Sequence, residues 1–147
     1  MTPARLVIAE DGYTLLHWQG GRWTELAALA GGASALLPTG YPMNDARLER
    51  AIELAENWLM PHAARLAGAV LEVRDATGRV TTSLSELLSV TTHAWSLDEV
   101  EAMFLRLVEL AGGRASQVLN GRQAFVADVL LLRELIHHGR LRRIQLA

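Results

Sequence analysis

Two glycine-containing turns divide the first thirty residues into three short segments, and they constrain the fold more than any other feature of the sequence. The turns lie at residues 11–12 (Asp-Gly) and 20–21 (Gly-Gly), between runs of β-prone residues. Tight hairpin turns need positive φ angles, which glycine adopts without steric cost. The sequence therefore predicts a three-stranded antiparallel meander at the N-terminus.

A second stretch with strand-like alternation covers residues 69–83. Apolar and polar side chains alternate in AVLEVRD, and Gly78 separates this run from the β-branched residues of RVTTS. This pattern predicts a central β-hairpin. Residues 84–92 fit either a short helix or a further strand, and the sequence leaves both open.

Three amphipathic segments have helical spacing. The first covers residues 45–60, with a cap at Asn44 or Asp45. The others cover residues 97–111 and residues 116–138 before Gly139, although the last helix could instead begin at Asn120. A final strand is expected within RLRRIQLA, residues 140–147.

The helix at residue 97 has the most complete start signal. Ser96 and Glu99 form a capping box, in which each side chain bonds the other residue's backbone N–H. Trp95 and Val100 occupy the positions of a hydrophobic staple. These signals agree on a helix that begins directly after Ser96.

The order of these elements is not the strict strand–helix alternation of a parallel α/β fold. We therefore expect an α+β fold, with antiparallel strands (the N-terminal meander and the central hairpin) packed with three main helices. A chain of 147 residues is within the usual size of one domain, so we expect a single globular domain over residues 1–147.

Composition excludes several kinds of chemistry. The sequence has no Cys, and all fourteen of its basic residues are Arg, which excludes thiolate sites and lysine-dependent sites such as a P-loop or a Schiff base. The N-terminal apolar run is too short for a signal peptide or a membrane span, so we expect a cytoplasmic protein without membrane contact.

The histidines and acidic residues give no metal signature. The sequence lacks HExxH, and the adjacent His137 and His138 would diverge by about 100 degrees on a helix. We therefore expect no metal site and no cofactor.

The candidate ligand-binding residues are Thr91, Thr92 and His93, just before the capped helix, and Ser34, in the glycine-rich loop of residues 31–42. A helix start can bind an anion, but three acidic residues in the first turn here would repel one. The capping signals leave His93 and the two threonines unexplained, so they remain candidates.

The C-terminal region contains one basic cluster, made of Arg133, Arg140, Arg142 and Arg143. Arg142 and Arg143 would point to opposite faces of a strand, and no aromatic residue lies among the four. With a net charge of −2 for the chain, we do not expect nucleic-acid binding.

Half of the residues are hydrophobic, the last helix is apolar around much of its circumference, and catalytic signatures are absent. The main interpretation is a non-catalytic binding or assembly module that self-associates or binds a protein partner. The alternative is a small metal-independent enzyme or small-molecule-binding protein, with a site near residues 31–42 and His93.

Overall fold

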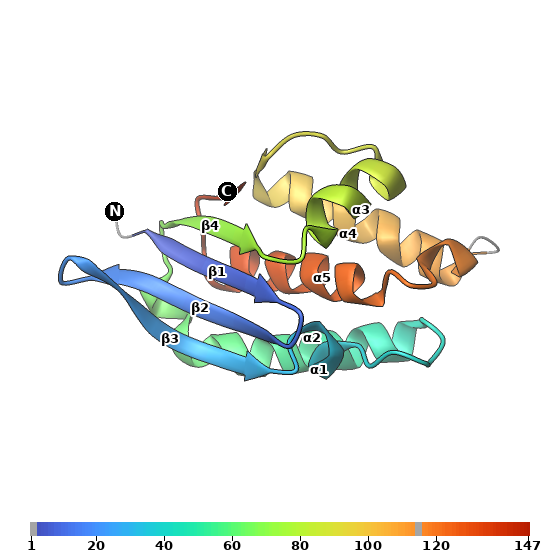
Figure 1. Cartoon of the computed structure of the whole chain (residues 1–147), viewed down its shortest axis with the longest axis horizontal. Helices are drawn as coiled ribbons and strands as arrows, with labels where there is room; N and C mark the ends of the chain where they lie inside the picture. Colours follow the sequence, from blue (N-terminus) through green and yellow to red (C-terminus); the bar gives the residue numbers. More distant parts are fainter. Residues whose placement is uncertain (1–2, 114–115) are drawn as a thin grey trace.

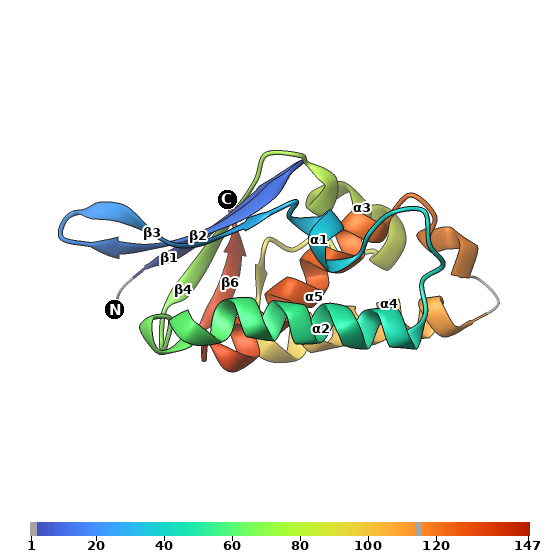
Figure 2. The same cartoon turned by 90° about the horizontal axis from the view of Figure 1, so that it is seen from below.

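The computed structural model describes residues 3–113 and 116–147, which form a six-stranded mixed sheet with helices packed against it (Figures 1 and 2). The strand order is β3-β2-β1-β4-β6-β5. The strands are β1 (Ala4–Ala9), β2 (Gly12–Gln19), β3 (Arg22–Ala30), β4 (Val70–Asp75), β5 (Ala94–Trp95) and β6 (Arg143–Leu146). The helices are α1 (Ala33–Leu36), α2 (Asp45–Leu59), α3 (Arg79–Leu88), α4 (Leu97–Gly112) and α5 (Gln123–His138), with 3-10 turns η1 (Met60–Arg65) and η2 (Ser116–Leu119).

The N-terminal meander is present as the sequence predicts. β1 pairs with β2, and β2 with β3, both antiparallel. The turn from β3 into α1 then packs closely on the β1–β2 turn, because Gly31 N–H donates to the carbonyl of Asp11 at 2.8 Å. A Cβ atom on Gly32, which has φ 53°, would lie 2.9 Å from the backbone of Gly12.

The rest of the sheet corrects the predicted fold class. β4 lies parallel to β1 on one side and to β6 on the other, so the sheet is mixed rather than an antiparallel meander plus a hairpin. β4 is the first half of the predicted hairpin, but its second half folds as α3. Gly78, with φ 74°, precedes this helix instead of turning a hairpin.

The spacing of apolar residues explains why residues 79–88 are helical. Val80, Leu84 and Leu88 recur every four residues and are all buried. The β-branched residues at 80–82 favour a strand locally, and burial of this four-residue stripe overrides that preference. The segment 84–92, left open by the sequence, continues α3 to Leu88 and then runs as a loop.

Two predicted helix starts and the predicted final strand are present in the structure. Asn44 caps α2, the Ser96–Glu99 capping box starts α4, and β6 buries Ile144 and Leu146 on one side. The glycine-rich loop is not entirely a loop, because it contains α1, which is one turn long.

The last predicted helix is divided in two. Residues 116–119 form η2, and α5 begins only at Gln123, after the turn at Gly121. Eleven of the sixteen residues of α5 are buried, and it contacts α1, α2, α3 and α4. Among the described residues, no helix combines the length and the apolar character that crossing a bilayer requires.

Candidate functional site

A buried polar network lies at the carboxyl ends of β1 and β4. Asp128, from the middle of α5, accepts a hydrogen bond from the Tyr13 hydroxyl at 2.6 Å. It also accepts two from Arg79, through Nε at 2.7 Å and Nη2 at 2.9 Å. Three elements distant in sequence, β2, α3 and α5, are therefore joined through one carboxylate.

The ionisation states in this network follow from its burial and its donors. Burial raises the pKa of the fully buried Asp128 to about 6, while the bonds from Arg79 and Tyr13 lower it. The carboxylate is therefore ionised at neutral pH, and it holds Arg79 as a cation. Burial raises the pKa of Tyr13, which remains a protonated donor.

A second carboxylate positions the start of α3. Asp75, the last residue of β4, accepts hydrogen bonds from the Thr77 N–H at 2.9 Å, the Thr77 hydroxyl at 2.5 Å and the Val80 N–H at 2.9 Å. Both of its oxygens are used in this way. Asp75 thus fixes the strand–helix connection that carries Thr77, Gly78 and Arg79.

This connection forms one wall of a cleft of about 300 Å³. The opposite wall is the start of α5, where Arg122 donates to the Ser83 hydroxyl at 2.8 Å and to the carboxylate of Glu86 at 2.5 Å. The cleft is lined by Thr77, Gly78, Arg79, Thr82, Ser83, Gly121, Arg122, Ala124 and Phe125. Two guanidinium groups, three hydroxyls and two glycines with little steric bulk make it suited to an anion.

Its place in the fold is also the expected one for a ligand. In open sheets with parallel strands, ligands bind beyond the carboxyl ends of those strands. The cleft lies beyond the end of β4, because Thr77, Gly78 and Arg79 line it and β4 ends at Asp75.

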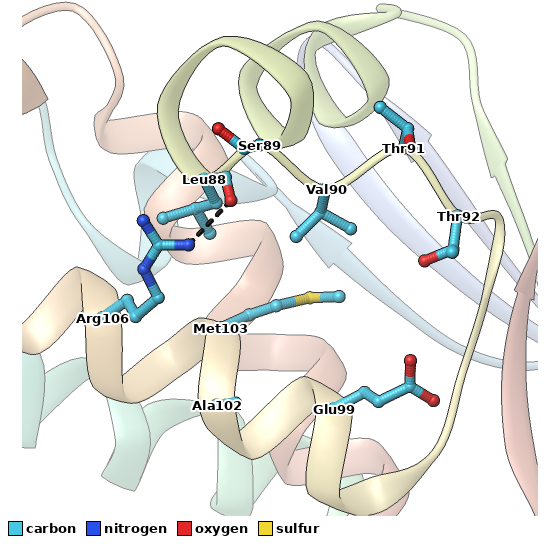
Figure 3. Close-up of a pocket in the computed structure, with 9 residues that line it drawn as sticks. All are labelled: Leu88, Ser89, Val90, Thr91, Thr92, Glu99, Ala102, Met103 and Arg106. Atoms are coloured by element: carbon cyan, nitrogen blue, oxygen red, sulfur yellow. Dashed lines mark hydrogen bonds between the residues drawn. The ribbon is translucent and has the colours of Figure 1, made fainter.

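The predicted residues Thr91, Thr92 and His93 lie elsewhere. The two threonines line a groove of about 360 Å³ between α3 and α4 (Figure 3). The polar side chains that α4 contributes to this groove form hydrogen bonds within the chain. Glu99 belongs to the capping box, and Arg106 donates to the carbonyl of Leu88 at 2.7 Å.

His93 is exposed and borders an adjoining cavity of about 190 Å³ together with Thr91 and Thr92. Neither residues 31–42 nor a carboxylate line that cavity. Ser34 is in α1, exposed, and its hydroxyl donates to the carbonyl of Gly31 at 2.8 Å. The structure thus brings His93 together with the two threonines but not with Ser34.

The four arginines of the predicted basic cluster do not form one surface. Arg133 lies over the ring of Phe104 and forms a bidentate ion pair with Glu101. Arg140, Arg142 and Arg143 are exposed near the start of β6. Arg143 pairs with Val70 at the beginning of β4, which is the end of the strand opposite the cleft.

Sequence analysis missed Arg79, Arg122 and Asp128. A signal for Asp128 does exist, since it is the one charged residue in the apolar run from Phe125 to Leu132, and a buried charge needs a partner. Nothing in the sequence indicates which arginine that partner is. Outside the cleft, Glu56, Glu134 and His138 form a group of side chains that could hold a metal ion.

No known protein family matches the sequence, and no curated protein is similar to it. Similarity appears only in three dimensions. The type II variant of the Ppx/GppA phosphatase of Aquifex aeolicus has a TM-score of 0.67 at 12% identity, over 99% of this chain and 53% of that one.

Two other solved structures give a similar result. An exopolyphosphatase from Cytophaga hutchinsonii has a TM-score of 0.66 at 11% identity, over 99% of this chain and 52% of its own. An exopolyphosphatase-like protein has a TM-score of 0.62 at 11% identity, over 100% and 54%. The chain therefore spans about half the length of these solved proteins.

These findings correct the main functional interpretation. The similar structures are described as phosphatases and exopolyphosphatases, which contradicts the prediction of a non-catalytic assembly module. The identities are low, and the similarity is one of fold. The chain has a mixed-sheet fold similar to that of the Ppx/GppA phosphatases.

Proposed function

We propose that this chain binds the phosphate group of a phosphoester or phosphoanhydride in the cleft between α3 and α5, as part of a phosphatase-type enzyme. The observation that carries the proposal is the convergence of Arg79, Arg122 and three hydroxyl groups on one cleft beyond the end of β4. The phosphatase descriptions of the similar structures support the same chemical class. We expect a cytoplasmic location.

Arg79 is suited to this role because Asp128 orients it. A guanidinium has five N–H donors, and Asp128 uses one on Nε and one on Nη2. The remaining donors, including both on Nη1, are available to phosphate oxygens. A guanidinium already fixed by a buried partner loses little conformational entropy when it binds an anion.

Arg122 would bind the same anion by exchanging its hydrogen bond to Glu86 for one to a phosphate oxygen. Its Nη1 group is held by Ser83, whereas its Nη2 group bonds Glu86, whose side chain is 57% exposed. A phosphate oxygen can replace the exposed Glu86 carboxylate at Nη2 without leaving a buried charge unpaired. In phosphoryl transfer, positioning and stabilisation of the charged transition state supply most of the catalysis, and two fixed guanidinium groups provide both.

The test is calorimetric titration of the protein with pyrophosphate and tripolyphosphate. Arg122→Gln should weaken binding by about 10- to 100-fold, because it removes charge-assisted hydrogen bonds. The matched control is Arg142→Gln, which removes one exposed arginine at the opposite end of β4. Equal losses in the two variants, or no binding by the unchanged protein at millimolar ligand, would overturn the proposal.

Release of inorganic phosphate tests the enzymatic part separately. The unchanged protein should release phosphate from one of these compounds, and Arg122→Gln should lower the rate by at least as much as it lowers affinity. Tight binding without any release would support a phosphate-binding domain and contradict catalysis by this chain.

A further inference from the structure

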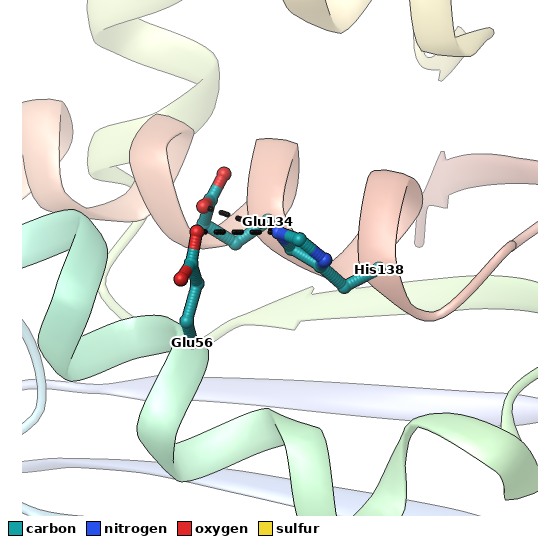
Figure 4. A group of neighbouring side chains, drawn as sticks. All are labelled: Glu56, Glu134 and His138. Carbon is teal, nitrogen blue, oxygen red and sulfur yellow. Dashed lines mark hydrogen bonds and ion pairs between the residues drawn. The ribbon is translucent and has the colours of Figure 1, made fainter.

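Three potential metal ligands from α2 and α5 converge at the packing interface of these helices (Figure 4). His138 Nε2 lies 3.2 Å from Glu56 Oε1 and 3.7 Å from Glu134 Oε1. All three ligand atoms lie within 4.8 Å of one another. The group is separate from the phosphate cleft, which lies beside the other end of α5.

These separations fit a shared metal ion. Zinc binds nitrogen and oxygen ligands at about 2.0 to 2.2 Å, so neighbouring ligand atoms around a tetrahedral ion lie about 3.3 to 3.5 Å apart. The distances from His138 Nε2 to the two carboxylates, 3.2 and 3.7 Å, fall on either side of that spacing. Small side-chain rotations would therefore bring the three atoms to coordination distance, with no movement of either helix.

The buried member of the group, Glu134, offers one carboxylate oxygen to the cluster. Glu134 has a side chain only 3% exposed, and its Oε2 accepts a hydrogen bond from Arg133 at 3.2 Å. Its Oε1 faces the cluster, 3.7 Å from His138 Nε2, and the Glu56 carboxyl group lies beside Glu134. A metal ion would give these carboxyl groups a shared cationic partner.

The surrounding charges favour a dication. Glu56, Glu101 and Glu134 surround a single guanidinium, that of Arg133. Carboxyl groups therefore outnumber guanidinium groups around the cluster, and a dication would balance them.

We propose that Glu56, Glu134 and His138 form a binding site for one divalent transition-metal ion of the zinc type, which links α2 to α5. Glu134 and His138 are four residues apart, so they project from the same face of α5, and Glu56 completes the set from the facing helix. An imidazole with two carboxylates suits Zn²⁺, Co²⁺ or Mn²⁺ better than Mg²⁺ or Ca²⁺, which prefer oxygen ligands alone. Glu56 and His138 are partly exposed, at 40% and 29% of their side chains, so the ion can enter from solvent and keep a water ligand.

The test uses tag-free protein, treated with EDTA and then freed of it, and titrated calorimetrically with ZnCl₂. We expect one Zn²⁺ per chain and a rise in the unfolding midpoint of about 5 to 10 °C at a hundredfold excess over Kd. Co²⁺ should give visible absorption bands of a coordinated ion, and MgCl₂ should give neither effect. Glu134→Gln, Glu56→Gln and His138→Ala should each lower zinc affinity by at least about 100-fold.

Two control variants distinguish binding at this site from nonspecific binding of zinc to the surface. Glu53→Gln removes an exposed carboxylate one turn earlier on α2, and His137→Ala removes the neighbouring imidazole; both should leave affinity unchanged within about twofold. Circular dichroism of Glu134→Gln without metal establishes that the variant is folded, as expected because Gln resembles the protonated carboxyl group. Zinc binding that survives Glu134→Gln, that depends on His137, or that is absent from the unchanged protein would overturn the proposal.

Discussion

Two buried carboxyl groups on α5, those of Asp128 and Glu134, differ in their hydrogen-bond partners. Asp128 accepts three hydrogen bonds, two of them from a guanidinium, so it is ionised at neutral pH despite complete burial. Glu134 accepts one hydrogen bond from Arg133, and burial together with contact with Glu56 raises its pKa to about 7. Burial is the largest cause that raises the pKa of both groups, and the donors to Asp128 lower its value.

Glu134 should therefore make metal-free stability depend on pH. Its folded pKa lies above its unfolded value of 4.5, so between about pH 4.5 and 7 the folded state retains a proton that the unfolded state loses. The free energy of unfolding should fall as pH rises through that interval and then level off. Arg133, Glu56, Glu101 and His138 are the charged groups that face it.

Urea unfolding at several pH values in EDTA, for the unchanged protein and Glu134→Gln, measures this contribution. The variant should lack that part of the pH dependence, because Gln cannot ionise, and Asp128 titrates equally in both proteins. Parallel stability curves between pH 4.5 and 7 would contradict the assignment.

At the scale of elements, the sequence correctly predicts the caps and turns that depend on a few neighbouring residues. The caps at Asn44 and Ser96 and the glycine turns of the meander act within a few residues, and all are present in the structure. α3 could not be predicted in this way. Gly78 with positive φ is compatible with a hairpin or with a helix start, and only burial of Leu84 and Leu88 against the rest of the fold decides between them.

The candidate site also depends on the folding of residues 79–88 as a helix packed against the rest of the chain. Arg79 faces Asp128, 49 residues later, only because residues 79–88 form a helix beside α5. A hairpin at this position would have placed its side chain on a strand. This is why single charges such as Asp128 could be recognised as unusual, while their partners could not be identified.

Substitution of Gly32 tests how closely the β3–α1 turn packs against the β1–β2 turn. Gly32→Ala would place a Cβ atom 2.9 Å from the Gly12 backbone and also impose a side chain at φ 53°, so we expect a loss of more than about 2 kcal/mol in unfolding free energy. Gly40→Ala also has positive φ, 87°, but no atom within 4 Å of the added Cβ, and should cost about 1 kcal/mol. Equal losses in the two variants by urea unfolding would mean that the turns do not pack closely.

At the scale of the whole molecule, α5 is the centre of the core. It lies among α1, α2, α3 and α4 (Figures 1 and 2). Its buried residues extend around most of the helix. The width of the apolar stripe, which the sequence analysis offered as support for self-association, is explained by this burial within the chain. Other helices of the same chain cover it.

Truncation of a core leucine should confirm this position. Leu130, on α5, is fully buried, so Leu130→Ala should lower the free energy of unfolding by about 2 to 5 kcal/mol. Leu105, on α4, is 51% exposed, and Leu105→Ala should change it by less than about 0.5 kcal/mol. Similar values for the two variants in urea unfolding would contradict a central α5.

The position of β6 affects how the chain folds during synthesis. β6 is the last strand in sequence, yet it lies between β4 and β5. β1 to β4 can pair once residue 75 has left the ribosome, but β5 gains its partner only after residues 143–146 emerge. At 5 to 20 residues per second, translation of the roughly fifty residues between β5 and β6 takes about 3 to 10 s. Throughout that time β4 has an unpaired edge, the kind of surface on which nascent chains aggregate or recruit chaperones.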